Sequence, residues 1–183
     1  MSNLKTWAID PMHSEILFKI RHLVISTVTG SFKKFEGKFV TEGDQFSNAK
    51  VTFKIDVKSV DTGQPARDEH LRNEDFFECE KYPDIDFEST SFIKIDNENY
   101  NIIGNLTMKG VTKSVELNAE YGGSEDNGHG VLKHGFAITG TVNRMDFGMT
   151  WNKLTDTGGL GLGEKIKLEA NIQLAEEVQE SVN

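Results

Sequence analysis

The feature that most constrains the fold is a strict alternation of apolar and polar residues in many short segments. The clearest run covers residues 165–174, where an apolar side chain stands at every second position. Successive side chains of a β-strand point to opposite faces, so this pattern predicts strands with one buried and one solvated face. The same alternation recurs in residues 16–21, 35–39, 51–58, 84–88, 114–119 and 136–142.

Turn-forming residues separate these segments, which indicates short antiparallel strands. Glu42-Gly43-Asp44 and the stretch from Asp96 to Asn99 are examples. About nine strand centres at this spacing predict an all-β barrel or sandwich. One helix is predicted over residues 65–72, where Pro65 in the first turn loses no hydrogen bond. A second short helical or kinked turn is expected between His22 and Gly30.

Length and composition predict one domain that folds without a cofactor. The chain has 183 residues, with 20 basic and 29 acidic side chains and a net charge of −9. This balance argues against general electrostatic binding to nucleic acid or to an anionic membrane. The charge is uneven, since residues 1–41 carry a net +3 and residues 67–88 a net −6. We assign residues 1–175 to the domain and expect 176–183 to be an acidic, frayed tail.

The cysteine count and the apolar segments bear on the cellular compartment of the protein. The single Cys79 excludes an intramolecular disulfide. The first residues lack the apolar segment of a secretory signal and no apolar run reaches 18 residues, so we expect a cytoplasmic protein without stable membrane insertion. The oligomeric state is open, with a two-fold homodimer as the common default.

Familiar catalytic and metal-binding motifs are absent from the sequence. The glycine run Gly159 to Gly163 leads into a strand, so we interpret it as a turn and not as a phosphate-binding loop. His13, His22 and His70 could form a metal or acid/base cluster, but no two share the spacing of one strand or helix. We therefore predict no catalytic residue, no metal site and no cofactor. His134, beside a glycine-containing loop, is expected to be exposed.

Two polar residues at strand ends occupy the alternate positions whose side chains are predicted to face the interior, here called the inward parity. His22 continues the inward set of residues 16–20, and Arg144 that of residues 136–142. There they could contact a ligand head group at a barrel mouth, or be satisfied by a backbone carbonyl or a carboxylate. Many of the 12 phenylalanines share this parity. A closed barrel of about eight strands is either just filled by side chains or holds one ligand, so they could form a core or a tunnel.

Ordered motifs add a family resemblance. Asp-x-x-His-Ser begins at Asp10, His-Leu-Arg-x-x-Asp-Phe-Phe at His70, and Leu-Thr-x-x-Gly-Val-Thr-Lys at Leu106. Longer matching stretches are Asp10 to His22, Gly30 to Phe39, Ser59 to Ser89, Gly104 to Val115 and Gly135 to Trp151. Together they resemble the YceI-like family, whose members have a lipocalin-like barrel and are described as polyisoprenoid-binding proteins. Many members carry a secretory signal, which this sequence does not show.

The resemblance implies an antiparallel lipocalin-like β-barrel of about eight strands, with one or two short helices and a ligand tunnel. The apolar residues it suggests for the tunnel are Phe18, Ile20, Phe35, Phe39, Phe53, Leu71, Phe76, Phe77, Phe87, Met108, Phe136 and Trp151. His22 and Arg144 would form a polar end. Asp10, His13, Ser14, His70 and Asp75 match family motifs and are expected to shape loops and the helix.

Three functions follow as hypotheses. The leading one is a non-catalytic binder or carrier of a long apolar molecule, such as a polyisoprenoid, an isoprenoid quinone or a fatty-acid derivative. The alternative is an enzyme that acts on a lipid in the same cavity, with His22, His70 or Asp75 as acid/base groups. The third is an interaction module with a filled barrel and an exposed apolar patch.

Overall fold

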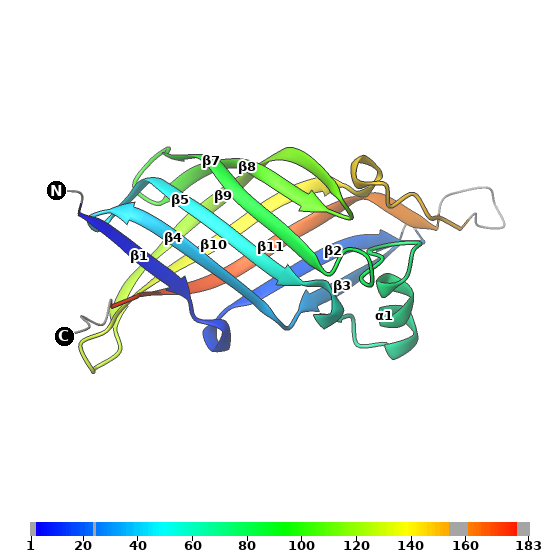
Figure 1. Cartoon of the computed structure of the whole chain (residues 1–183), viewed down its shortest axis with the longest axis horizontal. Coiled ribbons are helices and arrows are strands. Elements are labelled where there is room, and N and C mark those ends of the chain that lie inside the picture. Colours follow the sequence, from blue (N-terminus) through cyan, green and yellow to red (C-terminus); the bar gives the residue numbers. More distant parts are fainter. Residues whose placement is uncertain (1–2, 24, 154–160, 179–183) are drawn as a thin grey trace.

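The fold is an antiparallel β-barrel with a small helical attachment at one end (Figure 1). The computed structural model describes residues 3–23, 25–153 and 161–178. Within these ranges there are eleven strands, one α-helix and three short 3-10 helices. The elements are β1 (Leu4–Ile9), η1 (Pro11–His13), β2 (Glu15–His22), β3 (Ser26–Phe32), β4 (Phe35–Glu42), β5 (Gln45–Asp56), η2 (Val57–Ser59), β6 (Val60–Asp61), α1 (Pro65–Arg72), β7 (Asp84–Lys94), β8 (Asn99–Met108), β9 (Val111–Asp126), β10 (Leu132–Asn143), η3 (Arg144–Phe147) and β11 (Leu162–Glu176).

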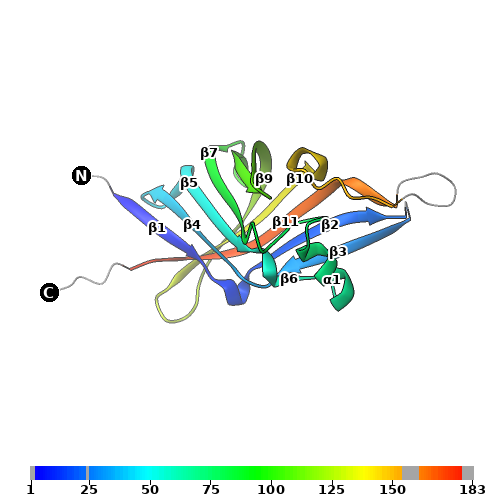
Figure 2. The ribbon, with the colours of Figure 1, turned by 45° about the vertical axis from the view of Figure 1, so that its right-hand side comes forward.

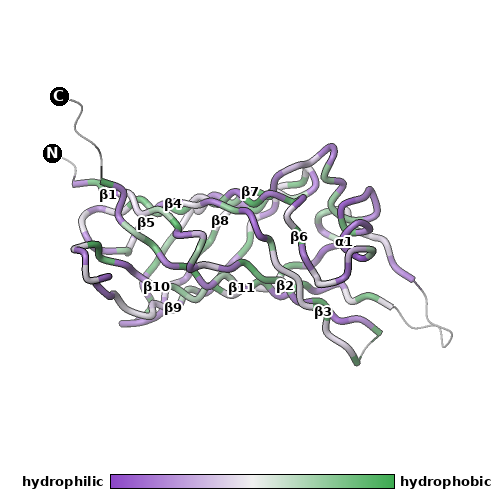
Figure 3. Tube along the Cα trace, turned by 90° about the horizontal axis from the view of Figure 1, so that it is seen from below, coloured by the Kyte–Doolittle hydropathy of each residue, from purple (hydrophilic) through white to green (hydrophobic). Residues whose placement is uncertain are grey.

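Eight strands close a ring in the order β1, β4, β5, β7, β8, β9, β10 and β11. The ring closes where β11 pairs with β1, with Trp7 opposite Glu176 and Ile9 opposite Leu174. The expected antiparallel barrel of about eight strands is therefore confirmed. Alternating hydrophilic and hydrophobic residues along the strands, visible in Figure 3, place one side of each strand in the interior.

The ring opens at one end because the β1–β2 segment is interrupted. The same edge of β11 pairs with β1 near its C-terminal end and with β2 along the preceding residues, where Ala170 pairs with Ile16 of β2. Between β1 and β2 stands η1, whose N-cap Asp10 accepts a hydrogen bond from the backbone N–H of Met12 at 3.0 Å. Beyond this break, β2, β3 and β6 extend the sheet away from the ring, and α1 lies beside them (Figure 2).

At the other end, aromatic side chains fill the interior. Phe39 is fully buried, and its ring centroid lies 5.6 Å from that of Phe136 and 5.9 Å from that of Phe92. Phe46 lies 5.0 Å from Phe136, and Trp7 donates to the Thr41 hydroxyl at 2.8 Å. We call this cluster the aromatic end; its members are Trp7, Phe39, Phe46, Phe92, Tyr100, Tyr121, His134 and Phe136.

Two local predictions can be compared with the structure. The turn expected between His22 and Gly30 is the hairpin turn between β2 and β3, in which Leu23 has a φ of 53°; its described residues contain no helical segment, and α1 is the one α-helix of the described ranges. The predicted tail begins too early, because Glu176 still pairs with Trp7 and the Glu177 N–H donates to the Thr6 carbonyl at 2.8 Å. Residues 179–183 lie outside the described residues, as do Gly159 and Leu160 of the glycine run, whereas Leu162 and Gly163 already belong to β11.

Candidate ligand-binding site

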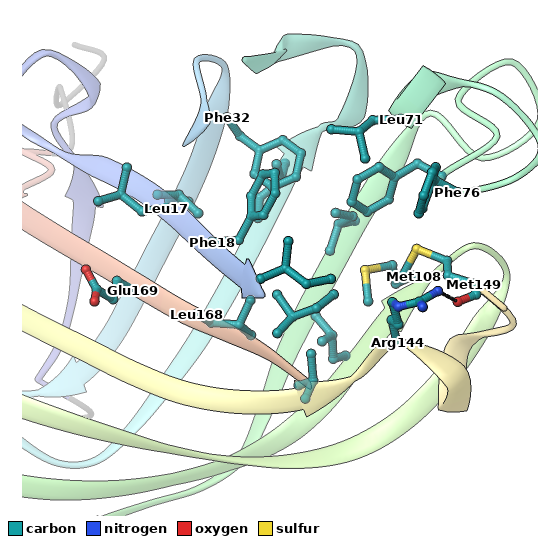
Figure 4. Close-up of a pocket in the computed structure, with 18 of the residues that line it drawn as sticks. Leu17, Phe18, Phe32, Leu71, Phe76, Met108, Arg144, Met149, Leu168 and Glu169 are labelled. Atoms are coloured by element: carbon teal, nitrogen blue, oxygen red, sulfur yellow. Dashed lines mark hydrogen bonds between the residues drawn. The ribbon is translucent and has the colours of Figure 1, made fainter. Parts of the chain in front are cut away.

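A cavity of about 310 Å³ occupies the end of the barrel where β2 and β3 leave the ring. This size falls at the lower limit of small-molecule sites. Its walls come from both sheet and helix, and Figure 4 shows Phe18 and Phe32 on one side with Met108 and Met149 on the other. We call this region the hollow end. Its geometry follows from the ring: an added hairpin and a helix widen an interior that eight strands alone would just fill.

Glycines let large side chains lie flat against the cavity wall. Phe18 on β2 stands opposite Gly30 on β3, and a Cβ atom at Gly30 would overlap the Phe18 ring. Gly104 on β8 is covered in the same way by Phe87 on β7. Because these positions carry no side chain, both rings rest on backbone and leave the centre of the barrel free.

Phe53 forms the floor between the two ends. It lines the cavity, while its ring centroid lies 6.1 Å from Phe39 of the aromatic end and 6.3 Å from Phe87. Below this level the rings contact one another across the interior. The cavity is therefore a blind pocket that opens at one end.

Polar groups gather where α1 meets the opening. The His70 imidazole Nε2 lies 2.8 Å from Asp75 Oδ2, and the ring packs edge-on against Trp151 at 4.7 Å between centroids. Arg67, which also borders the cavity, donates from Nε and Nη2 to Thr62 at 2.7 Å. Asp68 fixes the same turn, since its Oδ1 accepts from the Thr62 N–H and hydroxyl. These bonds hold α1 in place over the pocket.

Arg144 borders the cavity but is committed to the protein backbone. It is 1% exposed, and burial lowers the pKa of its guanidinium. Its nitrogen atoms donate to four carbonyl oxygens, of Met149 at 2.6 Å, Gly163 and Trp151 at 2.7 Å, and Leu162 at 3.4 Å. Figure 4 shows the bond to Met149. This matches the second of the two expectations for Arg144, satisfaction by backbone carbonyls. Arg144 joins the segment after β10 to the start of β11.

All but three of the residues suggested by the resemblance border the cavity. Those that do are Phe18, Ile20, His22, Phe53, Leu71, Phe76, Phe77, Phe87, Met108, Arg144 and Trp151. Phe39 and Phe136 belong instead to the aromatic end, and Phe35 packs against the core without reaching the cavity. His22 is exposed at the end of β2, at the rim. Contact of any of them with a ligand remains a prediction.

Several lining residues were missed by sequence reasoning. Val28, Phe32 and Val142 also border the pocket, as do Ile138, Ile166 and Leu168. Most of them lie on the inward parity already identified, so the alternation itself was a sufficient signal. Arg67, Met149 and Leu162 lie in the helix, a loop and a strand start, and no periodic pattern marks them.

Of the three histidines considered as a cluster, His22 and His70 both border the pocket, whereas His13 does not. His13 stands on η1 beside Asp10, His22 at the rim and His70 on α1. In the described ranges, no three His, Cys, Asp or Glu side chains are placed to hold a metal ion. His134 contradicts the expectation of exposure: it is 5% exposed, and its Nδ1 lies 2.7 Å from the Tyr121 hydroxyl.

The closed antiparallel barrel and its blind apolar pocket define the class of lipocalin-like barrel proteins. A family model described as the YceI-like domain matches residues 7–174, and the chain belongs to this family. The UPF0312 protein SA2479 of Staphylococcus aureus is 36% identical over 175 residues, covering 94% of this chain and 98% of the relative.

Solved structures show the same fold. A YCEI protein of Campylobacter jejuni is 37% identical, with a TM-score of 0.73 over 87% of this chain and 91% of that one. A polyisoprenoid-binding domain from Saccharophagus degradans has a TM-score of 0.66 over 93% of this chain and 98% of that one, at 14% identity. The latter likeness concerns the fold alone. Among the described residues, no helix has the length and apolar character needed to span a bilayer.

Proposed function

We propose that this protein binds one long-chain apolar molecule in the hollow end and carries or stores it. The observation that supports this most directly is the pocket lining, in which aliphatic and aromatic side chains from eight strands and α1 surround the space. Transfer of a methylene group from water into such a site is favourable by about 0.8 kcal/mol. Suitable ligands are a polyisoprenoid, an isoprenoid quinone or a fatty-acid derivative.

The pocket size limits how much of such a molecule is enclosed. At about 30 Å³ per water-sized group, the volume of about 310 Å³ holds roughly ten groups. Their gross transfer free energy is about 8 kcal/mol, from which the cost of association is subtracted. We therefore expect a long ligand to place one end against Phe53 and to extend through the opening.

Native mass spectrometry of the purified protein, followed by organic extraction, tests the proposal. The expected result is a mass increment that disappears on extraction, together with a long-chain lipid in the organic phase. Apo protein that also fails to bind added long-chain isoprenols and fatty acids would contradict it. The third hypothesis, a filled barrel, predicts that failure, although a pocket of this size already argues against it.

One observation favours an enzyme as the second candidate. His70 and Asp75 lie 2.8 Å apart at the pocket edge, and an imidazole oriented by a carboxylate is a common general base. Both side chains are about one-third exposed, which leaves access for substrate. Incubation with the extracted lipid separates the candidates: product that forms with the native protein and not with His70→Ala supports an enzyme, whereas unchanged lipid supports a carrier.

A further inference from the structure

The turn between β2 and β3 has an unusual composition for a hairpin. The other hairpin turns of the described ranges use residues suited to turns: Gly43 after β4, Asp96 to Asn99 after β7, Gly110 after β8, and Gly128 with Gly130 after β9. The β2–β3 turn instead reads Leu23-Val24-Ile25. Gly, Asn, Asp, Ser and Pro dominate turns because they tolerate the required backbone angles or bond to them.

Leu23 adopts this turn against its conformational preference. Its φ of 53° lies in the left-handed region, which disfavours residues with a bulky side chain. The turn nevertheless exposes apolar surface: Leu23 is 49% exposed and Ile25 is 91% exposed. Exposed apolar residues in a tight turn conflict with both the usual turn composition and the burial of apolar side chains. Such conflicts are expected at functional or strained positions.

This apolar turn stands at the opening of the pocket. His22, the last residue of β2, borders the cavity and pairs with Leu162, another lining residue. The Leu23 N–H donates to the Gly161 carbonyl at 2.8 Å, which ties the turn to the start of β11. In Figures 1 and 2 the tips of β2 and β3 project at the end of the molecule opposite the termini.

The charge of the hairpin differs from that of the rest of the chain. From Ile16 to Phe35 the sequence contains Lys19, Arg21, Lys33 and Lys34 but no carboxylate, although the whole chain carries −9. Lys19 forms an ion pair with Glu169 of β11 at 3.1 Å, and Lys33 and Lys34 follow the end of β3 that lies away from the turn, so Arg21 is the basic residue of the hairpin nearest the tip. The acidic segment 67–88 includes most of α1, which is mainly hydrophilic in Figure 3. An apolar tip with Arg21 beside it and no carboxylate in residues 16–35 suits the surface of a lipid bilayer, where apolar side chains enter the interface and a cation faces lipid phosphates.

We propose that Leu23 and Ile25 dock this end of the barrel onto a lipid bilayer, so that the pocket opens toward the membrane and an apolar ligand passes between them without crossing water. The ligand-transfer part rests on the proposed function, whereas the docking contact does not. The bilayer is the chosen partner because the same end presents an apolar pocket, and lipid phases are where molecules that fit such a pocket reside. Docking is reversible, since two side chains provide little apolar area.

Docking is tested without any pocket ligand by placing a fluorescent reporter at the turn. Ile25→Trp introduces an indole at the exposed tip, and Ile95→Trp is the matched control because Ile95 is 63% exposed beside the β7–β8 turn at the opposite end. Vesicles of bromine-labelled phosphatidylcholine with a minor share of phosphatidylglycerol quench an indole that enters them. The native protein, which carries Trp7 and Trp151, is measured as the reference. We expect the signal added by Ile25→Trp to be quenched and the signal added by Ile95→Trp to be unaffected. Equal quenching, quenching of the control alone, or no quenching overturns the proposal.

A second measurement tests the contribution of the apolar side chain. Ile25→Ser is expected to lower the vesicle partition coefficient about tenfold, because the variant lacks the almost fully exposed isoleucine side chain whose transfer into the bilayer favours binding. Ile95→Ser is expected to leave it unchanged. Unchanged partitioning of Ile25→Ser, or a tip indole whose emission depends on protein concentration and not on vesicles, overturns the proposal; the latter would indicate that a second copy covers the tip.

A third measurement separates docking from ligand binding. With a fluorescent long-chain fatty acid as probe, we expect transfer from protein to vesicles to accelerate with vesicle concentration, and Ile25→Ser to slow it about tenfold without changing equilibrium probe binding. Transfer at a rate independent of vesicle concentration contradicts the proposal. If the probe does not bind at all, the proposed function fails, while the quenching result still decides docking.

Discussion

The aromatic end and the hollow end of the barrel share most of the ring strands and the same types of side chain, but the cavity of about 310 Å³ lies at the hollow end. At the aromatic end, rings from opposite walls meet, as Phe39 and Phe136 do at 5.6 Å between centroids. At the hollow end, Phe18 and Phe32 contact each other at 5.4 Å along one wall. The difference therefore does not lie in hydrophobicity, which is high at both ends.

The circumference of the barrel accounts for the difference. At the aromatic end β1 closes the ring directly between β4 and β11. At the hollow end β2, β3, β6 and α1 stand in that interval, so the wall is longer and the same ring sizes no longer meet across it. Gly30 and Gly104 increase the effect by letting Phe18 and Phe87 lie against backbone. The break at η1, which admits these added elements, therefore produces the pocket.

The largest effect is expected from Phe39→Ala at the aromatic end. Phe39 is fully buried and its ring contacts four other aromatic rings, so its removal leaves a cavity that cannot collapse. We expect a loss of about 4 kcal/mol in the free energy of unfolding, measured in urea. Phe18→Ala at the hollow end is the matched comparison and should lose at least about 1 kcal/mol less, because Phe18 already borders free space. Equal losses would show that the two ends are packed alike.

Arg144→Met is expected to have the next largest effect, at the hollow end. The substitution leaves four carbonyl acceptors without their donor in a buried site. A loss of about 3 kcal/mol is expected, since each unsatisfied buried group costs about 1 to 3 kcal/mol and some recover water near the opening. Arg144→Lys is the control: lysine keeps the positive charge but lacks the planar guanidinium with its several N–H donors. It should recover less than half of the lost free energy of unfolding. Full recovery with lysine would mean that charge alone is needed.

Gly30→Val tests whether glycine keeps the pocket open. The new side chain would displace the Phe18 ring from the wall into the cavity. Overpacking of this kind costs about 1 to 3 kcal/mol, and binding of a long-chain fatty acid probe should fall by more than the change in stability explains. Phe18→Leu in the same background should restore binding. Undiminished binding in Gly30→Val would contradict this role.

Asp10→Asn acts at the break between the two ends. Asp10 accepts from Lys133 Nζ at 2.9 Å, and chiefly this bond lowers the pKa of its carboxyl group to about 2. Because the folded pKa lies below the unfolded value of about 3.9, the carboxylate stabilises the fold above pH 4, and this contribution is lost as the pH falls toward 2. Asp10→Asn should cost about 1 to 2 kcal/mol at neutral pH, and this cost should shrink as the pH falls from 4 through 2, as measured by urea unfolding across this range. A deficit that persists in acid would indicate a different role.

Period-two alternation was enough to predict the strands and an all-β barrel or sandwich, because burial of one face leaves a periodic trace in the sequence; the choice of a closed barrel came from the family resemblance. It could not separate Phe39 and Phe136 from Phe18 and Phe87, since all four fall on the inward parity. Which rings meet across the barrel depends on the local circumference. That circumference is set by the break at η1, where Asp10, His13 and Ser14 form bonds that no periodicity reveals.

Burial of single polar residues was equally hidden. His134 follows the glycine-containing β9–β10 loop, and this neighbourhood suggested exposure. In the barrel it lies at the beginning of β10, where Trp7, Phe46 and Tyr121 surround it with centroid distances of 4.7, 5.0 and 5.8 Å. A polar residue beside a loop carries no mark of such partners, which come from distant strands.

His134 is therefore expected to produce the smallest effect, a pH dependence of the aromatic end. Burial lowers the pKa of its imidazole from 6.5, and of the charged side chains near it Asp44 favours the proton while Lys5 opposes it. Below about pH 6.5 the unfolded chain binds a proton that the folded state excludes, so stability falls as the pH decreases from 7 toward 5. Replacing both partners, His134→Phe with Tyr121→Phe, should reduce this slope while keeping the rings packed. His129→Asn in the exposed β9–β10 loop is the control and should leave the slope unchanged. An unaltered slope in the double variant would assign the pH dependence to groups outside the aromatic end, because no other histidine belongs to that cluster among the residues that the structure describes.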